Sequence, residues 1–134
     1  MKEDWTFDFD WLQTRHYVKD QLNTTDLPNL NGILFMIGIQ ELGRWKKSFT
    51  KEEKQDLMHI AVCRLLSIKG YFLFKGRDQD GWPHFEQLKV ISKEGMEEQE
   101  KLLKEMAILY FKDLRTEHKQ LLKSKHNIQN DEEE

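Results

Sequence analysis

Residues 50–85 constrain the fold more than any other stretch, because the spacing of apolar side chains changes there from a helical to a strand period. Thr50 and Glu53 have the spacing of a capping box, in which each side chain accepts a hydrogen bond from the other residue's backbone N–H. Apolar residues then recur on one half of a helical surface as far as Ile68. Gly70 suits the left-handed conformation that commonly ends a helix. We therefore expect an amphipathic helix between Thr50 and Gly70.

The segment after this helix has the signals of a two-stranded hairpin. Residues 71–74 read Tyr-Phe-Leu-Phe, a composition typical of strands. Asp80 and Gly81 indicate a turn, and Pro83 suits an edge strand because it has no N–H to donate to a ladder. We expect an antiparallel hairpin that ends near Phe85.

Two helices are expected before this unit. The first covers about residues 10–22, where apolar residues recur at helical spacing, and the aromatic residues before it form a packed lead-in. The second covers about residues 30–42 and is apolar nearly all round, so it should be surrounded by protein. Gly32 and Gly38 each lower its helix propensity by about 1 kcal/mol relative to alanine. We expect them to allow close approach of a neighbouring backbone.

A fourth helix is expected after the hairpin, from about residue 93 to residue 125. At 1.5 Å per residue its length would be about 50 Å, more than the breadth of such a small domain. It should therefore either bend or break near residues 113–117, or its last turns should project beyond the body. Residues 127–134 end in four consecutive acidic side chains and are expected to form a disordered acidic tail.

These elements predict an α+β fold that is mostly α, with four helices and one antiparallel β-hairpin between the third and fourth helices. A chain of 134 residues can bury one core, so we expect a single globular domain over residues 1–126. The single cysteine excludes an internal disulfide. The apolar run at residues 33–39 is far shorter than the roughly 20 residues of a membrane-spanning helix, and residues 1–5 begin no signal peptide. We expect a cytoplasmic protein with no membrane partner.

Charge is distributed unevenly along the chain, although the net charge is only −3. Residues 44–89 contain ten Lys or Arg against six Asp or Glu, a local charge of +4. The segments on both sides are acidic. The central segment is therefore compatible with an acidic partner.

Asp56, His59 and Cys63 lie on one stripe of the expected third helix. Histidine and cysteine four residues apart can bind a transition metal or pair a thiolate with a base. A structural zinc site needs four ligands, however, and no other histidine stands at a recognisable partner spacing. We expect no metal and no other cofactor, and keep these three residues only as candidate ligands.

The sequence also allows two other classes of function, a nucleic-acid-binding protein and a small enzyme or ligand-binding domain. The order helix, linker, helix, hairpin is that of a winged-helix nucleic-acid-binding protein, but acidic residues on the third helix would be repelled by phosphates. A small enzyme or ligand-binding domain would need a pocket near Glu41 or His59. No second catalytic group can be placed beside Glu41 from the sequence, so the chain leans away from an enzyme, and nucleic acid is the less favoured partner.

Aromatic and basic residues on the linker and the hairpin are typical of anchors for a protein partner, and burial in the core is the equal alternative for the aromatic residues. The expected contact surface combines the linker at 44–47 with the hairpin tip at 77–85, and the fourth helix is a candidate homodimer contact. The predicted partner-binding residues are Arg44, Trp45, Lys46, Lys47, Arg77, Trp82, His84 and Phe85. We therefore expect a non-enzymatic cytoplasmic interaction domain with an unidentified protein partner.

Three stretches of the chain are similar to a small bacterial family of uncharacterised proteins. They read LNGILFMIGIQELG, EEKQDLMHIAVCRLLS and GYFLFKGRDQDGWPHFEQ, and together cover less than half of the chain. The resemblance implies a helical domain with a hairpin. It implies no activity, cofactor or site residue.

Overall fold

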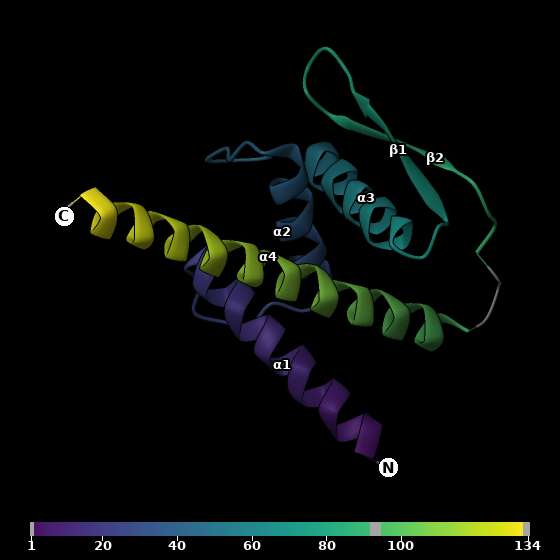
Figure 1. Ribbon diagram of the computed structural model, residues 1–134. Helices are drawn as coiled ribbons and strands as arrows, with labels where there is room; N and C mark the ends of the chain where they lie inside the picture. The colour runs from purple at the N-terminus through teal and green to yellow at the C-terminus, as the bar shows by residue number, and fades with distance from the viewer. Residues whose placement is uncertain (1, 92–94, 133–134) are drawn as a thin grey trace.

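The computed structural model describes residues 2–91 and 95–132 (Figure 1). The described residues form four α-helices and one two-stranded antiparallel sheet, which confirms the predicted fold class. The elements in chain order are α1 (Lys2–Leu22), α2 (Leu30–Leu42), α3 (Lys51–Ser67), β1 (Phe72–Arg77), β2 (Pro83–Gln87) and α4 (Met96–Glu132).

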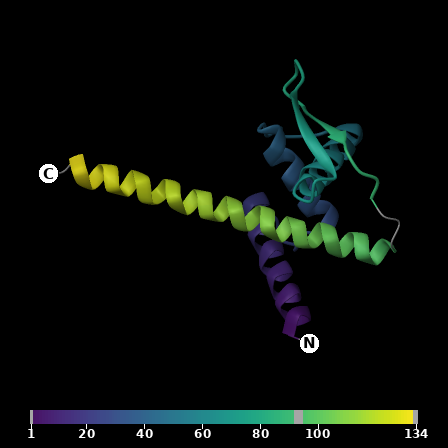
Figure 2. The ribbon, with the colours of Figure 1, turned by 45° about the vertical axis from the view of Figure 1, so that its right-hand side comes forward.

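The helices pack in two pairs that α4 links. α2 packs closely against α3, and α1 packs against α4, which also contacts α3 (Figures 1 and 2). Both strands of the hairpin lie on α3. The side of α3 that the sequence predicts to be polar is therefore partly covered by the hairpin.

The core consists of two clusters of buried side chains. The larger joins all four helices and includes Val18, Ile37, Leu65 and Phe111. The smaller lies between α2, the linker and α3, and Trp82 of the hairpin packs against it. Its buried members are Ile39, Leu42, Phe49 and Leu57. The smaller cluster therefore packs against both the linker and the hairpin tip.

The local signals at α2 and α3 are confirmed by the structure. Thr50 and Glu53 make both hydrogen bonds of the capping box. A Cβ atom added at Gly38 would lie 2.2 Å from the backbone oxygen of Leu57, so this glycine allows α2 and α3 to meet backbone against backbone. Gly32 is different, because its nearest neighbour is the side chain of Pro28 in the preceding loop.

α1 begins at Lys2 rather than near residue 10, so the expected lead-in is part of the helix. The aromatic residues at 5, 7, 9 and 11 alternate, which also suits a helix with aromatic side chains on two faces. Phe7 and Trp11 lie beneath lysines of α4, with Lys101 and Lys104 over their rings. Trp5 lies outside this contact with α4, and 64% of its surface is exposed.

α4 is continuous from Met96 to Glu132, without the break considered near residues 113–117. Its C-terminal part projects beyond the other helices in both views (Figures 1 and 2). Residues 127–132 are helical here, which differs from the expected disordered tail, and residues 133–134 lie outside the described part. The helix continues because residues 113–126 contain no proline or glycine to end it. Within the described residues, the helices long enough to cross a bilayer are too polar to do so.

Candidate interaction surface and adjoining cavity

The hairpin tip is fixed to the end of α2 by the side chain of Arg77. Its Nη2 donates to the backbone oxygen of Glu41 at 2.6 Å, and its Nη1 donates to those of Leu42 at 3.3 Å and Gly81 at 2.8 Å. The last carbonyls of a helix have no partner within the helix, and the negative end of its dipole favours a cation. Arg77 therefore holds the tip in place, and its side chain is exposed.

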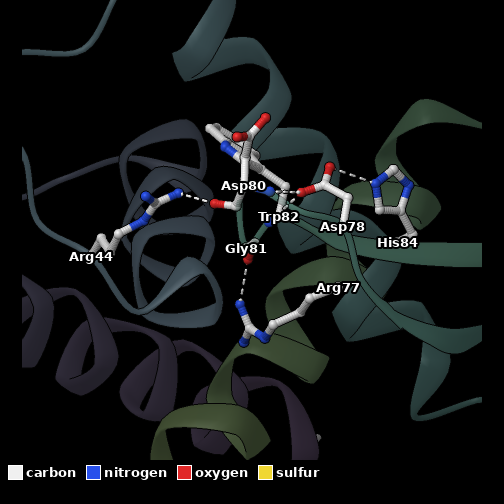
Figure 3. Close-up of polar contacts among 7 residues, drawn as sticks. All are labelled: Arg44, Arg77, Asp78, Asp80, Gly81, Trp82 and His84. Carbon is white, nitrogen blue, oxygen red and sulfur yellow. Dashed lines mark hydrogen bonds and ion pairs between the residues drawn. The ribbon is translucent and has the colours of Figure 1, made fainter.

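A second arginine joins the linker to the same tip. Arg44 Nη2 donates to the backbone oxygen of Asp80 at 2.5 Å (Figure 3). The two segments that the sequence predicts as one contact surface thus lie side by side, although 36 residues separate them in the chain. Their role in binding a partner stays a prediction.

Asp78 shapes the turn at the tip. One oxygen of its carboxylate accepts hydrogen bonds from the backbone N–H groups of Asp80 at 2.9 Å and Trp82 at 3.0 Å. The other lies 2.9 Å from Nε2 of His84 (Figure 3). The bond from His84, followed by that from the Trp82 N–H, lowers the pKa of Asp78 below its ordinary value. His84 is thus engaged in the turn.

A groove of about 550 Å³ lies between the linker and the tip. It is lined by Leu42, Arg44, Trp45, Lys46, Glu53, Asp80 and Trp82. Trp45 is 63% exposed and makes an edge contact with the buried ring of Phe49, with 6.5 Å between ring centroids. Lys46 Nζ lies 2.5 Å from a carboxylate oxygen of Glu53, and this bond is the main reason that the pKa of Glu53 is lowered.

Six of the eight predicted partner-binding residues are exposed, and two of those six, Arg77 and His84, lie on the hairpin. Arg44, Trp45, Lys46 and Lys47 are all exposed on the linker. Trp82 and Phe85 are half-buried, and the ring of Phe85 packs against Phe74 with centroids 5.6 Å apart. The exposed tryptophan of the predicted surface is therefore on the linker, whereas the exposed residues of the hairpin, Arg77 and His84, are basic.

A second cavity, of about 360 Å³, lies between α3 and the hairpin. Its titratable lining residues are Asp56, His59, Cys63, Asp78 and His84. Sequence reasoning missed His84 and Asp78 as neighbours of the α3 residues, because no local spacing signals a contact that depends on how the hairpin packs. Cys63 Sγ lies 3.6 Å from His59 Nε2, and burial raises the pKa of the thiol, so it stays protonated at neutral pH.

The described residues contain no group of three His, Cys, Asp or Glu side chains arranged to hold a metal ion. Glu41, the other predicted candidate, links three helices. Its carboxylate accepts a hydrogen bond from Tyr110 at 2.7 Å and lies 3.3 Å from Nε of Arg64. These contacts indicate a structural role for Glu41.

Comparisons with protein-family models, with curated proteins and with solved structures find no significant match to this chain. The predicted relation to a bacterial family stays a prediction.

Proposed function

We propose that this protein is a non-enzymatic cytoplasmic interaction domain. It binds an acidic segment of a partner protein, carrying an apolar side chain, in the groove between the linker and the hairpin tip. The observation that carries this proposal is the exposure of Trp45 on a linker held from two sides. The single cysteine, which excludes an internal disulfide, supports the cytoplasmic location.

Trp45 has the properties of a binding anchor. Tryptophan is enriched among the residues that dominate interface energetics, because its ring buries a large area. Phe49 below the ring and the Arg44–Asp80 hydrogen bond beside it limit the motion of the linker. Less conformational entropy is then lost when a partner covers the ring.

The groove lining holds Arg44 and Lys46 against Glu53 and Asp80, and the exposed Lys47 on the linker adds the positive charge that favours an acidic segment. Arg44 bonds to a backbone carbonyl, which leaves its positive charge without a compensating carboxylate in that contact. The positive charge of Lys46 is paired with the carboxylate of Glu53. Lys47, the next residue of the linker, is exposed. Complementary charge steers association and favours one class of partner over another.

The packing of α3 supports a protein partner over a nucleic acid. α3 contacts α2, α4 and both strands, so little of its surface is left to enter a groove of DNA. Glu52 and Asp56 are among its exposed residues and would be repelled by phosphates.

Selection from a random peptide display library tests the proposal. The wild type should enrich peptides in which an aromatic or aliphatic residue is flanked by Asp and Glu. Trp45→Ala should lose this enrichment, whereas Trp5→Ala should keep it, because Trp5 is equally exposed at 64% but lies on α1. Equal enrichment by the Trp45 variant, or peptides without acidic residues, would contradict the proposal.

A further inference from the structure

We propose that the cavity between α3 and the hairpin binds a small amine that carries an aromatic ring. This site is separate from the peptide groove, although Trp82 lines both. Its volume of about 360 Å³ lies within the range of small-molecule pockets. The class of ligand follows from the charge of the lining and from its aromatic walls.

The lining attracts a cation. It includes the carboxylates of Asp56 and Asp78, and none of the described lining residues is a lysine or arginine. These two carboxylates supply the negative charge of the lining. Asp78 is engaged by the turn, so the exposed Asp56 is the carboxylate that an ammonium group can reach.

The walls favour an organic cation with a ring. Phe72, Trp82 and Phe85 line the cavity, and aromatic rings attract both cations and other rings. A metal ion is disfavoured, because no three donor side chains among the described residues converge on one point.

Titration with benzylamine, followed by two-dimensional NMR at pH 8, tests this inference. Resonances of His59, Trp82 and His84 should shift and saturate. Benzyl alcohol, which lacks the charge, and butylamine, which lacks the ring, should each bind at least about fivefold more weakly. Equal binding of either compound would overturn the proposal, as would the absence of saturable shifts with benzylamine.

Two matched variants locate the ammonium group. Asp56→Asn should weaken benzylamine binding about fivefold, because it removes the reachable negative charge from an exposed position without changing the fold. Glu52→Gln, on the same helix but outside the cavity, should leave it unchanged. An unaltered affinity in Asp56→Asn would contradict the assignment. Trp45→Ala should also bind benzylamine normally, so this result stands independently of the peptide groove.

Discussion

Arg77 of the hairpin donates a hydrogen bond to the backbone oxygen of Glu41 in the last turn of α2, with 2.6 Å between the two atoms. This bond joins residues 36 positions apart in the chain. Together with the bond from Arg77 to Leu42, it fixes the hairpin tip against the end of α2. The tip thus held lines one side of the groove beside Trp45.

Arg77→Ala should lower the free energy of unfolding by about 1–3 kcal/mol, since it removes charge-assisted bonds to carbonyls that have no partner within the helix. Urea denaturation followed by circular dichroism measures the change. Lys75→Ala is the matched control, because Lys75 lies on the same strand and forms only an exposed ion pair with Glu86. Equal losses in the two variants would show that Arg77 does not hold the tip.

Gly38→Ala should destabilise the fold by about 1–3 kcal/mol or more, because the added methyl group would collide with the backbone of Leu57. Gly95→Ala should change stability by less than about 0.5 kcal/mol, since no atom lies within 4 Å of the corresponding Cβ position. Chemical denaturation compares the two. A tolerated Gly38→Ala would mean that α2 and α3 do not meet closely.

Asp78 should stabilise the fold in a manner that depends on pH. Its pKa is lowered on folding, so its contribution is fully present above the ordinary aspartate value of 3.8 and is lost as the pH falls through the lower value of the folded state. Asp78→Asn should therefore have a lower melting temperature than the wild type at pH 7, and the difference should shrink as the pH falls below 4. A difference that persists undiminished in acid would assign the stabilisation to hydrogen-bond geometry rather than to charge.

The projecting part of α4 is expected to form a homodimer. Leu121 and Leu122 are 60% and 54% exposed there, and a helix in water depends largely on packing of its apolar face. Light scattering should give twice the mass of one chain for the wild type and a single mass for Leu121→Asp/Leu122→Asp. The control is Leu73→Asp on β1, a leucine outside α4 that is 48% exposed. A monomeric wild type at high micromolar concentration would contradict the expectation.

Local signals made much of the fold predictable. The Thr50–Glu53 capping box and the Asp80-Gly81 turn act over a few residues, and both are present in the structure. The role of Gly38 could be predicted, because a glycine inside a buried helix usually allows a neighbouring backbone to approach closely. The sequence predicts too late a start for α1, because aromatic residues at alternate positions suit both a packed lead-in and a helix with aromatic side chains on two faces.

The candidate sites were less predictable, because they depend on contacts between distant segments. The linker and the hairpin tip could each be recognised by composition, but their adjacency depends on Arg44 and Arg77 bonding to backbone oxygens, which any residue type supplies. In the same way, the spacing of His59 and Cys63 was visible, whereas the position of His84 across the cavity follows from tertiary packing.

Affinity capture from lysate of the source cell tests the central claim most directly. Tagged wild type, Trp45→Ala and Trp5→Ala are compared, each with and without nuclease, and bound proteins are identified by mass spectrometry. We predict that one partner with an acidic segment is retained by the wild type and by Trp5→Ala, resists nuclease and is lost from Trp45→Ala. Retention of the same partner by Trp45→Ala, or its loss on nuclease treatment, would contradict the proposal that this surface recognises a protein.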